Sequence, residues 1–402
     1  MANLGNFSLL FALAVSLYAA LASWIGGWKG HRELVVSARN AIFASLGILS
    51  VASFALGYAF VTRDFSLTYV ASYSSRDMSF VYTLASFWAG SEGSLLFWAW
   101  TNALFASVLA YQNRKLTSPL IPYVFSVTMI TQAFFVLLMA FVTNPFNTVP
   151  FAPANGRGLN PLLENMGMFF HPPTLLLGYM GFTIPFAFAI AALATRKLNS
   201  EWLTSIRRWT MVGWVFLALG NIFGMQWAYV ELGWGGFWGW DPIENASLLP
   251  WLTATAFLHS AMIQKRRGML KIWNMVLIII TFTLTIFGTF LTRSGVLSSV
   301  HSFGQSALGP FFISFIMVAL IGSMLLLYSR RNDLKSDDEL DSLLSRESSF
   351  LFNNLILVGA TFATFLGVVF PLISEAVRGV KVTVGLRWTP KFRQLAKRES
   401  RS

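Results

Sequence analysis

Ten apolar segments of membrane-spanning length dominate the sequence and leave few options for its fold. They cover residues 7–25, 41–61, 94–111, 120–142, 174–194, 210–229, 248–263, 272–291, 311–328 and 351–373. A transmembrane helix needs about 20 consecutive, mainly apolar residues. The composition agrees, with 55% hydrophobic and 11% charged residues and a mean hydropathy of +0.60. We therefore predict an all-α, polytopic membrane protein of about ten transmembrane helices.

Basic residues gather in alternate loops between these segments. Arg114 and Lys115 lie in the third loop and Arg207 and Arg208 in the fifth, whereas the even-numbered loops are near neutral or acidic. Because basic loops normally face the cytoplasm, we predict that the N-terminus and the even-numbered loops face the outer compartment. The net charge of +12 then reflects topology in the lipid bilayer, so we predict no nucleic-acid partner. The chain has no cysteine, which excludes disulfides and a thiolate nucleophile of its own.

A tryptophan-rich stretch, WGGFWGWDPIENASLLPW, lies in the sixth predicted loop and the start of the next segment. Its tryptophans are Trp234, Trp238, Trp240 and Trp251. One interpretation is an interfacial loop whose rings anchor two spans. The other is a platform for a large flat ligand, which the density of rings and the intervening glycines favour. Asp241 followed by Pro and, at the third position, Glu predicts a capped helix start that ends the platform.

Two histidines in predicted outer loops flank this stretch in sequence, His171 before the fifth segment and His301 after the eighth. Each alone is typical of a surface histidine. Together, on the face of the aromatic platform, they indicate a bis-histidine axial site for haem iron. His259 differs because it lies inside an apolar segment, where an ionisable group indicates either function or a hydrogen bond between helices. His31, among basic residues, is typical of a solvated histidine.

Arg293, in the outer-facing sequence LTRSG, is a lone cation beside the predicted site. It can pair with a haem propionate, with Glu231 or with Glu244, and the sequence does not separate these partners. Trp88, Glu92 and Trp98, in the stretch WAGSEGSLLFW, are predicted to add to the same outer surface, although an acid at a helix start also has a purely structural role.

The sequence WGGFWGWDPIENASLLPWL resembles the WWD signature of haem-handling membrane proteins, within a segment that we place at residues 227–251. The wider context is similar to the CcmF family of haem lyase subunits. Three further stretches carry that resemblance: WAGSEGSLLFW at 88–98, GLNPLLENMGMFFHPPTLLLGYMG at 158–181 and GTFLTRSGVLSSVHSF at 288–303. They occur in family order over residues 1–385, which is one predicted haem-handling domain.

The resemblance implies a set of haem contacts and partners. His171 and His301 match the family's outer haem ligands, and His259 matches one of two intramembrane ligands of a bound b-type haem. In this family, haem arrives on the chaperone CcmE. The CxxCH thiols of apocytochrome c, presented with CcmH and in some systems CcmI, then form thioethers to it. The implied location is a bacterial inner membrane, with the WWD platform facing the periplasm.

A haem lyase of this kind positions two partners, so we assign no residue as acid or base. Two related alternatives are the lyase variant that serves multihaem nitrite reductase and a CcsA-type lyase. Two further alternatives are a non-catalytic haem-delivery module, as in CcmC-type proteins, and an inactive fragment of the lyase. Haem bound without thioether formation distinguishes the delivery module from the lyase.

The last residues, 386–402, differ from the rest of the chain. They read LRWTPKFRQLAKRESRS, a polar and basic stretch on the predicted outer side, and do not resemble the family. Family members continue with further spans that supply the second intramembrane histidine. We therefore expect a truncated or frame-shifted ending, or a naturally split protein, and a second ligand for the b-type haem that this chain lacks.

Overall fold

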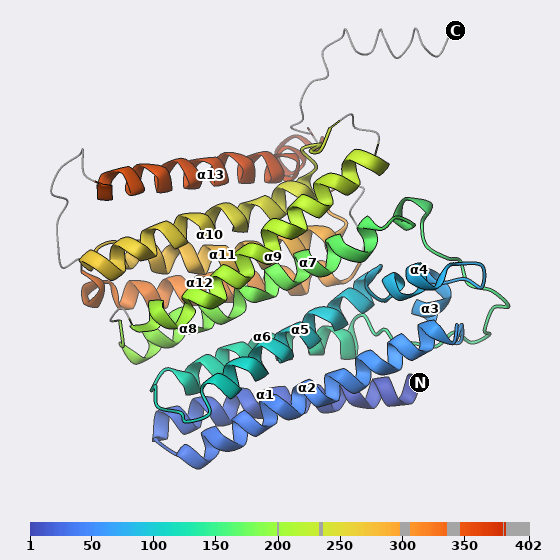
Figure 1. Ribbon diagram of the computed structural model, residues 1–402, viewed down its shortest axis with the longest axis horizontal. Helices are drawn as coiled ribbons and strands as arrows, with labels where there is room; N and C mark the ends of the chain where they lie inside the picture. Colours follow the sequence, from blue (N-terminus) through green and yellow to red (C-terminus); the bar gives the residue numbers. More distant parts are fainter. Residues whose placement is uncertain (199–200, 233–235, 298–305, 336–345, 381, 383–402) are drawn as a thin grey trace, which may run out of the picture.

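The computed structural model is an all-helical bundle (Figure 1). It describes residues 1–402 apart from 199–200, 233–235, 298–305, 336–345, 381 and 383–402. The helices are α1 (Ala2–Lys29), α2 (Arg32–Val61), α3 (Thr68–Tyr73), α4 (Phe80–Ala85), α5 (Ser91–Gln112), α6 (Ile121–Phe141), α7 (Gly167–Gly181), α8 (Thr183–Thr195), α9 (Glu201–Glu231), α10 (Pro242–Arg267), α11 (Lys271–Ser294), α12 (Leu308–Ser329) and α13 (Arg346–Arg378). Short 3₁₀ turns lie at Ser86–Trp88, Pro161–Leu163 and Arg331–Leu334.

Ten helical stretches in the described part of the chain are long and apolar enough to cross a membrane. This confirms the predicted all-α, ten-span architecture. The fifth stretch, Gly167–Thr195, consists of α7 and α8 and begins well before the predicted boundary at residue 174. The prediction that His171 lies in a loop is therefore wrong, because His171 lies within α7.

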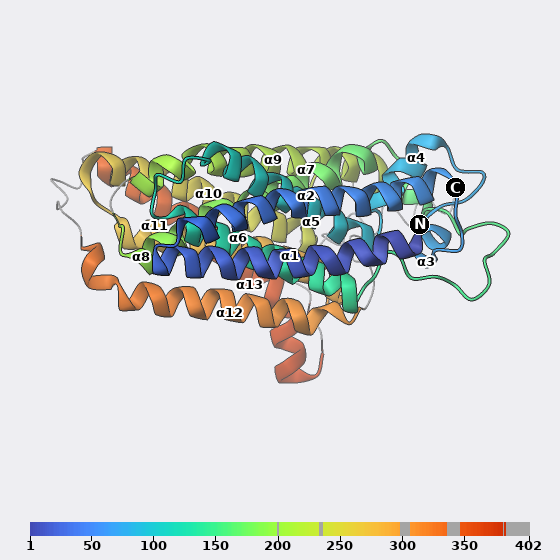
Figure 2. The ribbon, with the colours of Figure 1, turned by 90° about the horizontal axis from the view of Figure 1, so that it is seen from below.

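The helices form two groups. In the first, α1 packs against α2 and α6, and α5 packs against α2 and α6. In the second, α7 packs against α9, and α10 packs against α9, α11 and α13. Contacts of α6 with α8 join the groups, while α12 and α13 lie at the outside of the bundle (Figure 2). Most buried apolar side chains belong to one continuous core.

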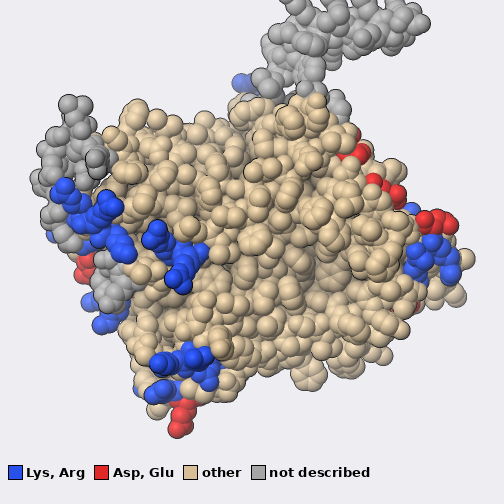
Figure 3. All heavy atoms as spheres, in the orientation of Figure 1, with Lys and Arg blue, Asp and Glu red and all other residues tan. Residues whose placement is uncertain are grey.

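Basic side chains gather at the end of the bundle that contains Lys29, which we call the Lys29 end, at the left of Figure 3. The opposite end, which contains Met1 and which we call the Met1 end, carries most of the visible acidic side chains, with a few basic ones. The loop charges predicted from the sequence are therefore sorted by the fold to opposite ends of the helices.

Helices α7 and α9 approach each other through glycines. A Cβ atom added to Gly178 would lie 2.5 Å from the backbone nitrogen of Leu217, and one added to Gly181 would lie 2.6 Å from the Cα atom of Gly213. Small residues let helix backbones come this close in membrane proteins, where association depends on direct packing. The α7–α9 pair therefore has no room for a side chain at these positions.

We predict that Gly178→Leu destabilises the protein by about 3 kcal/mol, because the added side chain meets backbone that cannot move aside. The matched control is Gly57→Leu in α2, where a Cβ atom meets nothing within 4 Å. There the better helix propensity of leucine makes the change neutral or stabilising. Thermal unfolding in detergent measures both, and equal midpoints for the two variants would show that the contact does not constrain the fold.

Candidate functional site

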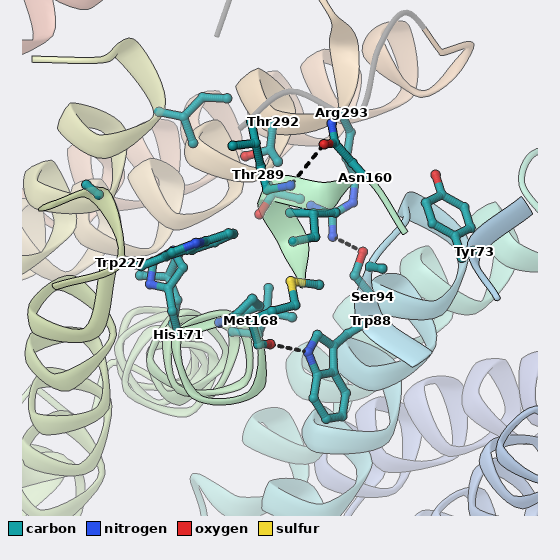
Figure 4. Close-up of a pocket in the computed structure, with 18 of the residues that line it drawn as sticks. Tyr73, Trp88, Ser94, Asn160, Met168, His171, Trp227, Thr289, Thr292 and Arg293 are labelled. Atoms are coloured by element: carbon teal, nitrogen blue, oxygen red, sulfur yellow. Dashed lines mark hydrogen bonds between the residues drawn. The ribbon is translucent and has the colours of Figure 1, made fainter. Parts of the chain in front are cut away.

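The main candidate site is a cavity of about 440 Å³ at the Met1 end, between α5, α7, α9 and α11 (Figure 4). Its lining combines aromatic rings, a histidine, a cation and small polar groups. The residues that matter for its chemistry are Tyr73, Trp88, Ser94, Met168, His171, Tyr179, Trp227, Thr289, Thr292 and Arg293. The sequence separates them by up to 220 positions, so only the tertiary fold assembles this pocket.

His171 is held by the close α7–α9 contact. Its Nδ1 atom lies 2.7 Å from the carbonyl oxygen of Gly220 in α9. A carbonyl can only accept, so Nδ1 carries a proton, and in the neutral tautomer that this contact selects the lone pair is on Nε2. A Cβ atom on Gly224 would lie 2.7 Å from the ring, so this glycine leaves the space that the imidazole occupies. A backbone carbonyl on one nitrogen is the usual arrangement around a metal-binding histidine.

Trp88 is positioned by a proline in α7. Pro172 has no N–H, which leaves the carbonyl of Met168, four residues earlier, without its usual helical partner. The indole Nε1 of Trp88 donates to that carbonyl at 2.9 Å (Figure 4). The Trp88 ring also packs edge-on against Phe169, with 5.8 Å between ring centroids. The proline in the sequence HPP therefore frees the carbonyl that holds the Trp88 ring against the helix that carries His171.

Trp227 forms the wall beside His171, with 5.8 Å between the two ring centroids. Its indole Nε1 is buried and has no hydrogen-bond partner among the described residues. A buried donor of this kind is costly without a partner and is available to an acceptor on a ligand. From the sequence, Trp227 was predicted only as the boundary of the WWD segment. Trp227 follows Gly220 by seven residues and Gly224 by three, which places all three on the same face of α9. This spacing is the feature of the sequence that indicates a place for Trp227 in the site.

Arg293 is 2% exposed at the wall of the pocket. Its Nη2 donates to Ser94 Oγ at 2.6 Å, and its guanidinium lies 5.7 Å from the ring centroid of Trp98. Glu92, in the first turn of α5, contributes a favourable charge interaction. The two acids predicted as partners of Arg293 have other contacts: Glu231 accepts from Asn165, and Glu244 accepts from backbone N–H groups of the α10 cap. Glu92 was not predicted as a partner.

Tyr73, which also lines the pocket, lies outside the spanning helices. Burial and the nearby charge of Glu92 raise the pKa of Tyr73 from its ordinary value of 10.0 to about 12. Its neighbour Tyr69 accepts a hydrogen bond from Gly90 N–H at 2.9 Å, and burial raises the pKa of Tyr69 well above its ordinary value. Both phenols are therefore neutral at physiological pH and act as hydrogen-bonding groups.

The tryptophan-rich stretch is only partly described, since Trp234 lies outside the described residues. The predicted capping box is present: Asp241 Oδ1 accepts from Ile243 N–H at 2.9 Å, and Glu244 returns the bond to Asp241 N–H. Trp238 Nε1 donates to Asn245 Oδ1 at 3.2 Å.

Two rings of the platform lie in contrasting environments. Trp240 is 46% exposed and adopts a left-handed φ of 55°. Trp251 lies about 15 Å along α10 from Asp241, stacked on Trp214 with 5.5 Å between centroids. Trp251 is therefore part of helix packing at a different depth from Trp238 and Trp240.

Of the two outer histidines, only His171 can be placed, because His301 lies outside the described residues. His171 and Trp238 both line a second, small cavity of about 30 Å³. The structure therefore places the described end of the tryptophan stretch beside His171. Arg293, Trp88 and His171 share the larger pocket.

His259 lies far from this pocket. Helix α10 continues through Pro250, so His259 is roughly 26 Å along the helix axis from Pro242. Its Nδ1 lies 2.8 Å from the side-chain amide of Asn353 in α13. The polar pair NN at 353–354 inside an apolar segment is the feature of the sequence that indicates this contact.

We predict that Arg293→Met destabilises the protein by about 2 kcal/mol, because Ser94 Oγ loses its buried donor and the partly buried Glu92 loses a favourable charge interaction. The double variant Arg293→Met/Glu92→Gln should recover part of that loss. The control is Arg157→Met, an exposed arginine at the same end, with an effect within about 0.5 kcal/mol. Denaturation in detergent of these three variants and of Glu92→Gln alone gives the four values, and additive single effects in the double variant would contradict the coupling.

The comparisons with known proteins agree on one family. The family model for cytochrome c assembly proteins matches residues 88–297. The cytochrome c-type biogenesis protein CcmF of Haemophilus influenzae is 41% identical over 396 residues, which cover 98% of this chain and 60% of that protein. CcmF of Escherichia coli is 40% identical over 388 residues, covering 96% of this chain and 60% of the relative. NrfE of Haemophilus influenzae is 36% identical over 386 residues, covering 95% and 60%.

A solved structure of the cytochrome c heme lyase CcmF matches with a TM-score of 0.77 and 34% identity, over 93% of this chain and 57% of that one. The chain thus spans about 60% of the length of these relatives. The family model covers more than half of the chain, from the aromatic stretch at Trp88 to the segment that follows Arg293. The chain is therefore a multi-pass membrane protein that belongs to the cytochrome c assembly protein family.

Proposed function

We propose that this chain is the haem-handling part of a cytochrome c haem lyase, which takes haem and positions it for attachment to apocytochrome c. The proposal rests mainly on the position of His171. Its Nδ1 donates to the Gly220 carbonyl, so that the lone pair of the neutral ring is on Nε2, and His171 lines the aromatic pocket. That donor set suits haem iron, which binds neutral imidazole nitrogen.

The segregation of charge supports an orientation in a bacterial inner membrane. The basic Lys29 end would face the cytoplasm by the positive-inside rule, and the Met1 end, with the pocket and the WWD segment, would face the periplasm. That is the side on which an external haem donor and an apocytochrome can reach the pocket.

The residues of the proposed haem site have distinct proposed roles. His171 would hold the haem iron through Nε2, and His301 would be the second protein ligand. Trp88, Trp227 and Trp238 supply aromatic surface for the porphyrin. Arg293 supplies positive charge for a propionate. The bound haem supplies the vinyl groups to which thiols add, and the chain itself only orients the ring and excludes water.

The thiols come from the substrate. The chain has no cysteine, so the CxxCH thiols of apocytochrome c are the nucleophiles in this proposal. Haem would be delivered by CcmE, and CcmH, with CcmI in some systems, would present the apocytochrome. Holding two reactants in one geometry can lower a barrier by several kcal/mol, which is the contribution proposed for this chain in place of acid–base catalysis.

A second haem, of the b type, is proposed at His259. The Asn353 amide N–H donates to Nδ1, which puts the ring proton on Nε2. A half-turn of the amide would present Oδ1 to Nδ1–H and give Nε2 the lone pair. We propose that His259 would hold a b-type haem through Nε2 in this second arrangement.

For the outer site, we predict that His171→Ala weakens haem binding. The loss should at least match the roughly 10–100-fold that removal of a hydrogen-bond partner of a ligand costs. Haem titration of the purified protein, followed by the Soret band, gives the affinity, and cytochrome c maturation in cells gives the function.

The matched control is His31→Ala, an exposed histidine at the Lys29 end, which should behave as the parent. Normal haem capture and maturation by His171→Ala would refute the ligand assignment. Haem captured by the parent protein without thioether formation, even with CcmE and apocytochrome present, would instead support a haem-delivery module.

For the intramembrane site, we predict that His259→Ala removes tightly bound b-type haem, seen as a missing Soret band. Asn353→Leu should keep the band but lower haem affinity about tenfold, because the ring loses the partner that fixes its tautomer. Asn354→Leu is the control, since that amide donates to its own helix at Phe350. An unchanged band in His259→Ala would refute the site.

A further inference from the structure

A second large cavity, of about 790 Å³, lies at the Lys29 end of the bundle. Its walls are the last turns of α5 and the first turns of α9, and Phe188 of α8 lines it between them. It is at the seam between the two helix groups and has no residue in common with the pocket of His171. The proposed haem chemistry therefore does not account for it.

The lining of the cavity changes from apolar to polar along the helix axes. Leu104, Phe105, Trp209 and Val212 line the end toward the middle of the bundle. The rings of Phe105 and Trp209 meet edge-on with 5.6 Å between centroids, and so join the two walls. This part of the lining is therefore apolar enough to contact a hydrocarbon chain.

The other end of the cavity is polar. Gln112 and Asn113 lie at the end of α5, and Thr204, Ser205 and Arg208 lie near the start of α9. Arg208 is exposed and makes no hydrogen bond or ion pair in the described part of the chain. The lining is therefore amphipathic, with its single charged side chain at the surface.

The surroundings of the polar end are strongly basic. The loop after α5 contributes Arg114 and Lys115, and the loop before α9 contributes Arg196 and Lys197. Glu201 is the only acid in the sequence of these two connections up to Arg208. The field at the mouth of the cavity therefore attracts an anion.

We propose that this cavity binds one anionic phospholipid, with an acyl chain between α5 and α9 and the phosphate at Arg208. The lining extends about 12–14 Å along each helix, close to the roughly 15 Å of one bilayer leaflet. Basic pockets between transmembrane helices are known places for anionic headgroups. The lipid would fill the seam between the two helix groups and hold them together.

Native mass spectrometry of the purified full chain tests the proposal. The delipidated protein is mixed with palmitoyl-oleoyl phosphatidylglycerol or with the corresponding phosphatidylcholine at equal concentration. The parent should retain phosphatidylglycerol preferentially. Arg208→Gln should reduce that retention about fivefold, the effect of one basic residue near an anionic lipid.

Two further variants separate the parts of the site. Arg207→Gln removes the same charge from the neighbouring exposed position, which does not line the cavity, and should retain lipid as the parent does. Val212→Trp fills the apolar end and should reduce retention while Arg208 stays in place. Circular dichroism and thermal midpoints show whether each variant is folded.

Three results would overturn the proposal. Equal retention of both lipids by the parent would show no selection for negative charge. Loss of retention in Arg207→Gln to the same extent as in Arg208→Gln would show general surface attraction. Retention unaffected by Val212→Trp but abolished by inorganic phosphate would show a free-phosphate site without a lipid chain.

Discussion

The backbone contact between α7 and α9 is the constraint on which the pocket depends. Glycines at 178, 181 and 213 have no room for a side chain of their own at the contact between the two helices, so close packing fixes the helix separation. At that separation the Gly220 carbonyl meets His171 Nδ1, and Gly224 leaves space for the ring. A wider spacing would break this hydrogen bond, and the proton of the imidazole would no longer be fixed on Nδ1. The chemistry of the histidine is therefore a consequence of close helix packing.

The proline pair that follows His171 also positions the aromatic wall of the pocket. A proline in the second turn of a helix normally counts against helix formation, because it removes a backbone donor. Here the carbonyl that loses its partner, at Met168, becomes the acceptor for the Trp88 indole. One local defect in α7 thus connects the helix that carries His171 to the segment before α5, which belongs to the first helix group.

The sequence predicted the parts of this structure that depend on local signals. Ten spans follow from length and hydropathy, and the Asp241 capping box follows from residues three apart. Positions that depend on helix pairing were missed. His171 lies in a helix because tertiary contacts compensate its prolines, and Asn353 meets His259 across 94 positions. Trp251 stacks within the bundle because α10 continues into the membrane, which a linear motif does not reveal.

The buried Arg293 carries the strongest energetic argument about the pocket. A cation that is 2% exposed is costly in a low-dielectric interior unless neighbouring groups compensate it. Ser94, the face of Trp98 and the charge of Glu92 provide that compensation. An anionic group that enters the pocket therefore meets a cation whose charge is already partly balanced. Such a site positions the anionic group without binding it very tightly. This suits the proposed ligand, haem, which would be received from one protein and released attached to another.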